Sequence, residues 1–322
     1  MKDVKIIATG FAVPEHIVTN DDLSKILDTS DEWIVKRTGI KRRHISQNEN
    51  TSDLATRVAK TLLSQSNVRT QDIDLIVVAT MTPDNMTPAT AAIVQGRIAA
   101  EKAVCFDISA ACSGFSYAIS LARSMMLTNN WRHAIVIGAE VLSKLLDWTD
   151  RSTAVLFGDG AGGVLLSQSN ATHLLGQSLK TYGNKGDQLI AGHLDVSYDI
   201  LKNKKKLSAF TMNGQEIYRF ATHEVPRSIL KACSNAQIEL DQINYFLLHQ
   251  ANSRIITQVA KKLNQPLSKF GVNIDEYGNT AAASEAILLA EIIQKNRIKP
   301  GEIIALSGFG GGLTTATLII KY

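Results

Sequence analysis

Short apolar runs alternate along the chain with stretches of helical spacing. The run over 73–80 (IDLIVVAT) is too brief for a helix and rich in β-branched residues. It lacks strict polar alternation, which is typical of a strand buried on both faces. Further apolar runs predict strands at 103–108, 133–138 and 154–157. Helical stretches over 89–100 and 115–127 lie between them, so the chain predicts an α/β fold with helices on both faces of a sheet.

Three further helices are indicated outside this series of strands. Thr29 and Glu32 have the spacing of a capping box and predict a short helix that ends at Gly39. Apolar residues at every fourth position over 54–62 predict a second helix. A helix predicted around 215–233 contains Pro226, which should bend or break it.

The second half of the chain echoes the first. The run INYFLLHQ resembles IDLIVVAT in pattern, and GDGAGGVLL is echoed by GGGLTTATLII. We therefore expect two similar α/β halves, residues 1–170 and 171–322, related by a pseudo-two-fold axis. The polar stretch 183–206 ends in a run of lysines, and we expect it to be an exposed excursion.

Composition and net charge indicate a globular protein and do not indicate one that binds nucleic acid. The chain has 322 residues, of which 45% are apolar and 20% charged, so it has ample material for a core. Lys and Arg number 34 against 30 Asp and Glu, and this net charge of +4 does not indicate a nucleic-acid partner. The longest apolar runs fall far below the roughly 20 residues that span a bilayer. The N-terminus is a poor signal peptide, so we expect a cytoplasmic protein without a membrane segment.

Three cysteines are present, and one of them has a suggestive position. Cys105, Cys112 and Cys233 show no paired spacing, which argues against a disulfide framework or a metal site. Cys112 follows the strand 103–108 and precedes the helix 115–127. A helix N-terminus favours the thiolate, so Cys112 is a candidate nucleophile. The alternative is a small buried core cysteine.

An imidazole and an amide occupy comparable junctions. His249 ends the run YFLLHQAN, and Asn279 comes just before an Ala-rich helix. Alone, His249 could be a core histidine and Asn279 a helix cap. Together with Cys112 they predict a site beyond the carboxyl ends of strands, where open α/β sheets bind ligands.

The glycine clusters do not indicate a nucleotide site. Residues 158–163 match G-x-G-x-x-G, but a strand-like run follows them where a dinucleotide site needs a helix. The second cluster, 308–312, also precedes a strand-like run and could supply a backbone N–H to an oxyanion hole. Arg254, Lys261 and Lys262 share one helix face, which is either a solvated surface or a docking surface for an acidic partner.

Six segments in order identify a family. They are DTSDEWIVKRTGI, DISAACSGF, RSTAVLFGDGAGG, LLHQAN, YGNTAAAS and GFGGG. Together they resemble β-ketoacyl-acyl-carrier-protein synthase III of type II fatty-acid synthesis, from the N-terminus to Tyr322. The resemblance implies a thiolase-like five-layered α-β-α-β-α sandwich of two pseudo-symmetric halves, usually a homodimer.

The resemblance also implies a reaction. An acyl-CoA primer and malonyl-acyl-carrier protein condense to 3-oxoacyl-acyl-carrier protein, CoA and CO2 through an acyl-cysteine, and no cofactor takes part. Cys112 resembles the nucleophile of the family. His249 and Asn279 resemble the pair that holds the malonyl thioester carbonyl during decarboxylation. The backbone N–H groups of Cys112 and Gly311 resemble the second oxyanion hole.

Binding residues are implied in the same way. Those that resemble CoA contacts are Trp33, Arg37, Arg151, Gly214 and Asn252. Those that resemble the basic surface for the acidic carrier protein are Arg219, Arg254, Lys261 and Lys262. Phe309 and Thr87 resemble residues of the acyl pocket. Thr87 stands where acetyl-preferring members carry a bulky phenylalanine that reaches across the dimer, so we expect primers longer than acetyl, straight or branched.

Three other functions are open at this point. A related condensing enzyme of secondary metabolism would use CoA thioesters alone and need no carrier-protein surface. A cysteine hydrolase would use Cys112 and His249 to cleave thioesters without a malonyl donor. A non-catalytic binding protein would not depend on Cys112 at all.

Overall fold

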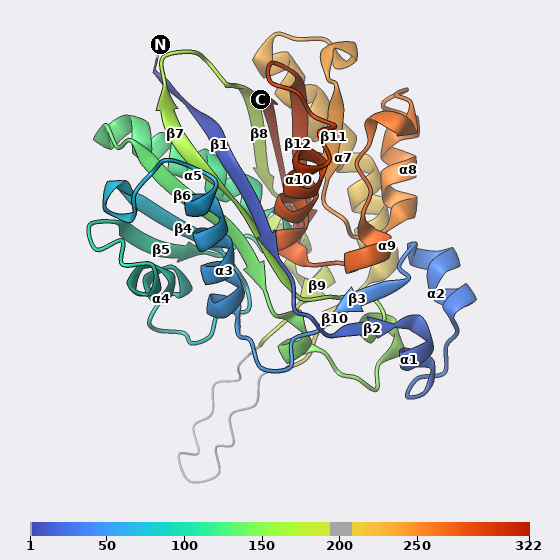
Figure 1. The fold of residues 1–322 in the computed structure, drawn as a ribbon. Helices are drawn as coiled ribbons and strands as arrows, with labels where there is room; N and C mark the ends of the chain where they lie inside the picture. Colours follow the sequence, from blue (N-terminus) through green and yellow to red (C-terminus); the bar gives the residue numbers. More distant parts are fainter. Residues whose placement is uncertain (1, 194–207) are drawn as a thin grey trace.

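Two sheets and three layers of helices are stacked in the computed structural model, which describes residues 2–193 and 208–322 (Figure 1). The first sheet has the order β1 (Asp3–Ala12), β7 (Gly160–Ser169), β6 (His133–Glu140), β4 (Leu75–Ala79), β5 (Val104–Ile108). The second has the order β11 (Tyr245–Leu248), β12 (Ile303–Gly310), β13 (Thr314–Lys321), β8 (Leu174–Thr181). Helices α5 (Gly114–Asn129) and α10 (Ser284–Gln294) lie between the sheets.

The outer helices complete the five layers. Helices α3 (Thr51–Ser64) and α4 (Thr90–Arg97) cover the outer face of the first sheet, and α7 (Gly214–Ala236) and α8 (Ser253–Lys262) cover that of the second. The short elements α1 (Asn20–Ser24), α2 (Asp31–Thr38), β2 (Ile17–Thr19) and β3 (Arg42–His44) form a lobe at one side of the molecule, which packs against Ala154, Val155 and Ile274. None of the described helices is long and apolar enough to cross a membrane.

Burial on both faces explains the continuous apolar strands. Along β4, Leu75 and Val77 point into the middle layer, whereas Ile76 and Val78 pack against α3 and α4. Each buried aliphatic side chain of this kind stabilises the fold by about 1.5–3 kcal/mol. The sequence therefore shows no polar alternation at this strand.

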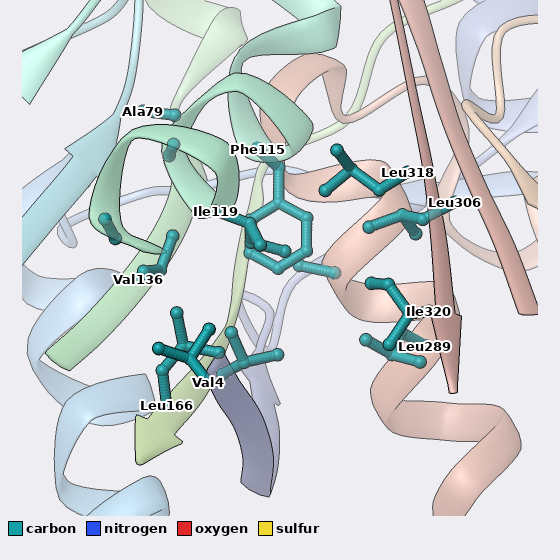
Figure 2. Close-up of a cluster of buried hydrophobic side chains, with 14 of the residues drawn as sticks. Val4, Ala79, Phe115, Ile119, Val136, Leu166, Leu289, Leu306, Leu318 and Ile320 are labelled. Carbon is teal, nitrogen blue, oxygen red and sulfur yellow. The ribbon is translucent and has the colours of Figure 1, made fainter. Parts of the chain in front are cut away.

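The middle layer joins both sheets into one core (Figure 2). Phe115 and Ile119 of α5 lie among side chains of both sheets and of α10. These side chains include Val4, Ala79, Val136, Leu166, Leu289, Leu306, Leu318 and Ile320. All strands of the first sheet end by Ser169 and all strands of the second begin at Leu174 or later, whereas β2 pairs only with β3 outside both sheets. The division into halves at residue 170 stays a prediction, because the two sheets share this core.

The order of elements repeats between the two sheets. In both, an outer helix follows the edge strand (β1 then α3, β8 then α7), and a central helix leads to the last two strands (α5 to β6 and β7, α10 to β12 and β13). Ala111 and Ala281 both have φ 44° and begin the 3-10 turns Ala111–Ser113 and Ala281–Ala283, which lead into α5 and α10. Phe270 forms an isolated parallel bridge with Phe246 of β11, at the position that β5 occupies beside β4.

The structure corrects three local predictions. Residues 154–157 do not form a strand, because the Asp150 side chain caps the helix α6 (Arg151–Ala154) by accepting from the Ser152 N–H at 2.8 Å. The cap of α2 is Ser30, whose hydroxyl accepts from the Trp33 N–H, so the predicted capping position Thr29 is one residue early. Helix α7 continues through Pro226 and is not broken there.

The described part of the predicted excursion 183–206, residues 183–193, is only partly exposed. Residues Gly183–Gln188 form a 3-10 helix, and β9 (Leu189–Ile190) pairs with β10 (Thr211–Met212). Leu189 packs against two of the hydrophobic clusters, because β10 holds it against the body of the protein. The lysine run 202–206 lies outside the described residues.

Close backbone packing at Gly138 of β6 gives a stability prediction. A Cβ atom at Gly138 would collide with the carbonyl of Ala282, so we expect Gly138→Ala to lower the free energy of unfolding by about 1–3 kcal/mol. Gly96 in α4 has no atom near its Cβ position, and Gly96→Ala should instead stabilise by about 0.5–1 kcal/mol. Denaturant unfolding of both variants checks the pair. Equal effects of the two substitutions would contradict the packing argument.

Candidate active site

The three residues singled out at strand and helix junctions meet in one pocket. Cys112, His249 and Asn279 all line a cavity of about 430 Å³ between the two sheets' ends. All three are buried. Because they come from three different turns, the pocket exists only when both sheets are in place.

Cys112 lies in the 3-10 turn that leads into α5. Gly310, at the end of β12, is packed directly against it: a Cβ at Gly310 would lie 2.8 Å from both the Cβ and the backbone N of Cys112. Only glycine allows this approach. The second sheet therefore fixes the position of a thiol that belongs to the first.

Burial changes the expected ionisation of this thiol. Exclusion from water raises the pKa of Cys112 above its ordinary value, and the nearby Glu140 and Glu285 carboxyl groups add to the increase. The sequence-based expectation of a favoured thiolate is therefore wrong for this buried side chain. The helix N-terminus is present, but the loss of solvation outweighs it.

His249 follows β11 and is held by a hydroxyl behind it. Its Nδ1 lies 2.6 Å from Ser284 Oγ, which also accepts a hydrogen bond from the Gln250 N–H at 3.4 Å. While Ser284 Oγ accepts from Gln250, its own hydrogen can be donated to Nδ1. In that arrangement the neutral ring carries its proton on Nε2. Burial lowers the pKa of His249 to about 3, so the ring is neutral near pH 7.

The backbone of Asn279 forms two hydrogen bonds with the segment 156–158. Its N–H donates to the Leu156 carbonyl at 2.9 Å, and its carbonyl accepts from the Gly158 N–H at 3.0 Å. Its side-chain Oδ1 accepts from the Ala281 N–H at 2.9 Å. Asn279 is not the cap of the helix that follows, because Thr280 caps the 3-10 turn and Ala283 caps α10. The bond from Ala281 occupies Oδ1 and leaves the Nδ2 hydrogens, and the site interpretation stays a prediction.

Apolar side chains form the inner wall around these three residues, and sequence reasoning missed most of them. Phe157 and Phe210 stack with ring centroids 4.6 Å apart, and Phe309 meets the His249 ring edge-on at 5.0 Å. The missed residues include Met81, Leu156, Phe157, Leu189, Phe210, Met212 and Ser284. Phe157 and Ser284 stand in the quoted segments RSTAVLFGDGAGG and YGNTAAAS, but nothing in the local pattern distinguishes them from core residues.

The predicted CoA residues lie at the mouth of the pocket. Arg37, Gly214 and Asn252 line both the pocket and the hollow outside it. Trp33 lines that hollow, with the guanidinium carbons of Arg37 and Arg151 at 4.5 and 4.9 Å from its ring centroid. The mouth thus carries an aromatic face and two cations.

The other predicted binding residues are distributed around the pocket. Arg254 lines the pocket, and its guanidinium donates to the Lys36 carbonyl at 2.7 Å. Lys261 and Lys262 are exposed at the end of α8, and Lys262 borders a surface hollow with Arg219, which pairs with Glu216. Gly311 lines a neighbouring cavity. Thr87 is exposed and lines neither cavity, so any role in the acyl pocket requires a second copy of the chain.

Comparison with known proteins identifies the family. The family model 3-oxoacyl-[acyl-carrier-protein (ACP)] synthase III matches residues 106–183, and the model of its C-terminal part matches 233–322. The β-ketoacyl-[acyl-carrier-protein] synthase III of Limosilactobacillus reuteri (strain DSM 20016) is 57% identical over 324 residues, with 100% of both chains covered. The chain belongs to the β-ketoacyl-acyl-carrier-protein synthase III family.

Solved structures of the family agree with the architecture. The synthase III of Aquifex aeolicus VF5 superposes with a TM-score of 0.92 at 40% identity, covering 99% of this chain and 100% of that one. The enzyme of Thermus thermophilus gives a TM-score of 0.92 at 38% identity, covering 98% of each chain. The predicted family, five-layered fold and acyltransferase class are confirmed. The roles of individual site residues stay predictions.

The geometry at His249 predicts a fixed, neutral tautomer. In 15N NMR of the labelled protein, we expect the Nε2–H form from pH 8 down to pH 5, because the lowered pKa keeps the ring unprotonated where an ordinary imidazole titrates near 6.5. In Ser284→Ala, Nδ1 loses its donor and the Nδ1–H form should appear. Ser284→Thr keeps the hydroxyl and is the matched control. Titration near pH 6.5 in the wild type would contradict the assignment.

Proposed function

We propose that the chain catalyses the initiating condensation of fatty-acid synthesis, with Cys112, His249 and Asn279 as its catalytic residues. An acyl-CoA primer, malonyl-acyl-carrier protein and one proton give 3-oxoacyl-acyl-carrier protein, CoA and CO2. The observation that carries the assignment is the meeting of a thiol, a neutral imidazole and a free amide N–H in one buried pocket of a synthase III. No group beyond the chain and its two substrates takes part.

In the first step the Cys112 sulfur attacks the thioester carbonyl of the primer. The new S–C bond forms as the bond to the CoA sulfur breaks, and CoA leaves as the thiol with the proton that Cys112 loses. The backbone N–H groups of Cys112 and Gly311 stabilise the oxyanion between these events. Because the pKa of the buried thiol is raised, we infer that proton loss is coupled to substrate binding.

The second step is decarboxylation of the malonyl thioester. Loss of CO2 leaves an enolate, whose oxygen accepts hydrogen bonds from His249 Nε2–H and Asn279 Nδ2–H. A neutral imidazole suits this task, since the donor faces the pocket without a counter-charge to desolvate. The low dielectric of the closed pocket strengthens both bonds.

In the third step the carbanion carbon attacks the acyl-cysteine carbonyl. A C–C bond forms, the C–S bond to Cys112 breaks, and the released thiolate recovers a proton from solvent. Two sets of hydrogen-bond donors thus serve the condensation. The backbone N–H groups of Cys112 and Gly311 stabilise the oxyanion of the primer carbonyl, and His249 with Asn279 stabilises the enolate oxygen of the malonyl thioester. This order predicts ping-pong kinetics.

The mouth of the pocket suits the CoA part of the primer, and the surface at the end of α8 suits the carrier protein. Trp33 with Arg37 and Arg151 offers stacking and cationic contacts that suit a nucleotide end. Lys261 and Lys262 give the exposed end of α8 a positive charge that suits an acidic carrier protein.

Assembly as a homodimer is part of this proposal. Strand β5 lies at the edge of the first sheet, and its Val104 side chain is 44% exposed. An open, apolar edge strand is unusual in a monomer and suits pairing with a second copy. A cytoplasmic location is proposed together with the homodimer.

Separate assays of the partial reactions test the catalytic roles. We expect Cys112→Ala to abolish acyl transfer from acyl-CoA while decarboxylation of malonyl-carrier protein survives. His249→Ala and Asn279→Ala should each lower decarboxylation by about 100-fold or more, as loss of an oxyanion donor does, and should still allow acylation of Cys112. Mass spectrometry of the acyl-enzyme and release of labelled CO2 give the two readouts. Loss of decarboxylation in a folded Cys112→Ala protein would overturn this division of roles.

The same assays separate the other functions. Comparable turnover with malonyl-CoA would favour an enzyme that uses CoA thioesters alone. Hydrolysis of acyl-CoA as the main activity without a malonyl donor would favour a hydrolase.

Charge reversal tests the docking surface. We expect Lys262→Glu to raise the KM for malonyl-carrier protein by about three- to tenfold, because it replaces attraction to an acidic partner with repulsion. The KM for acyl-CoA should stay unchanged. Lys60→Glu, on the exposed side of α3, is the matched control. Equal KM values for the two variants would place the docking surface elsewhere.

A further inference from the structure

Arg43, in the middle of β3, is a buried arginine without a carboxylate partner among the described residues. None of its surface is exposed. Its Nη1 donates to the Val18 carbonyl at 3.2 Å and its Nη2 to the Val155 carbonyl at 2.8 Å, while Nε has no partner in the part of the chain that the structure describes. Burial lowers the pKa of Arg43 to about 10, so the guanidinium stays charged near pH 7.

A buried charge of this kind needs a reason beyond packing. Removing a guanidinium from water is costly, and two neutral carbonyls offset less of that cost than a carboxylate would. An unbranched apolar side chain such as methionine would fill similar space without this cost. The position therefore favours a role that depends on the two N–H donors, and the backbone groups that they hold indicate which role it is.

The stem of Arg43 lies beside the two backbone segments that meet at Asn279. A Cβ atom at Gly158 would lie 3.1 Å from the Arg43 Cβ, and one at Gly278 would lie 3.4 Å from it. These two glycines adjoin the parallel bridge between Phe157 and Asn279. The arginine thus packs against both sides of the bridge that holds Asn279 in the wall of the pocket.

The guanidinium holds the residue that leads into this bridge. Val155 follows the last residue of α6, and its carbonyl accepts from Arg43. The next carbonyl along the chain, that of Leu156, accepts the Asn279 N–H at 2.9 Å. Arg43 therefore acts one residue away from the backbone group that supports the Asn279 amide.

The second donor joins the same support to the lobe. Val18 lies in β2, opposite Arg43 in the β2–β3 pair. Figure 1 shows β3 between β2 and α9 (Ile274–Tyr277), the short helix that comes just before Gly278 and Asn279. One side chain therefore connects three backbone segments around the base of Asn279.

The CoA residues of the mouth have supports of their own. Arg151, at the start of α6, donates to the Asp28 carbonyl at 2.5 Å, and Asp150 caps the helix there. Cys112 and His249 are held by Gly310 and Ser284 respectively. A change at Arg43 should therefore reach Asn279 more strongly than the other parts of the site.

We propose that Arg43 is a positioning residue for Asn279, and that it serves decarboxylation of the malonyl thioester and not acylation of Cys112. The inference rests on the proposed function. The Asn279 Nδ2–H must meet the enolate oxygen at hydrogen-bond distance, and a misplacement of about 1 Å can lower a rate on the order of 100-fold. Without the Arg43 donors, the segment 155–158 can shift and carry Asn279 with it.

The two partial reactions of Arg43→Met test the proposal. This variant keeps an unbranched side chain of similar length and removes the charge and both donors. We expect decarboxylation of malonyl-carrier protein to fall at least tenfold, while the single-turnover rate of Cys112 acylation from acyl-CoA stays within about twofold of the wild type. Arg43→Lys keeps the charge and a donor and should lose less. If Arg43→Met does not fold, Arg43→Lys serves in its place, with a loss of about threefold or more confined to decarboxylation.

A double-mutant cycle shows whether the effect passes through Asn279. In the Asn279→Ala background, Arg43→Met should lower decarboxylation by less than about twofold further, because the amide that it positions is gone. Arg123→Met is the matched control, since Arg123 pairs with Asp3 and does not line the pocket. It should lower the melting temperature and leave both partial reactions unchanged.

The outcomes separate this inference from the proposed function. Equal losses of acylation and decarboxylation, unchanged decarboxylation in a folded Arg43 variant, or a full additive loss in the Asn279→Ala background would each overturn the inference. A selective loss of decarboxylation in Arg123→Met would do so too, because the effect would then belong to general destabilisation. Failure of the wild type to form acyl-Cys112 or to release CO2 would instead overturn the proposed function.

Discussion

The structure depends on two close backbone contacts. In each, a strand of one sheet packs against the turn that precedes the central helix of the other half. Gly138 of β6 lets the first sheet touch the backbone at Ala282, just before α10. Gly308 and Gly310 of β12 let the second sheet touch Ser113 and Cys112, just before α5. A Cβ atom at any of these glycines would collide with main-chain atoms, so the contacts exclude every other residue. The catalytic pocket lies where the two contacts meet, and neither half could form it alone.

This packing also determines the charge state of the site. Exclusion of water raises the pKa of Glu140 to about 7 and of Glu285 to about 8, and it lowers that of His249 to about 3. Carboxyl and imidazole side chains that would be charged at the protein surface are therefore neutral, or titrate near pH 7, at this site. Chemistry that generates an enolate benefits, because fixed neutral donors need no reorganisation of solvent as the charge develops. The cost is a thiol that is harder to ionise before the substrate arrives.

Much of the fold could be predicted because its strands are buried on both faces, which leaves a simple signal in the sequence. The error at 154–157 arose because an apolar run was compatible with either element, and a single aspartate, Asp150, decided for a helical turn. Cys112, His249 and Asn279 could be located as chemical residues at junctions. Ser284 could not, because its importance lies in a contact with a residue 35 positions away in the sequence. Phe157 and Phe210 were missed for the same reason, because an apolar side chain carries no local sign of the cavity that it lines.

Under the proposed mechanism a single nucleophile serves two substrates in turn, and this order places a further requirement on the pocket. Both thioesters would reach Cys112 and His249 from the mouth that carries Arg37 and Arg254. An acyl group attached to Cys112 after the first step would have to leave this entrance clear for the malonyl thioester, because ping-pong chemistry uses the same sulfur and the same mouth in both half-reactions.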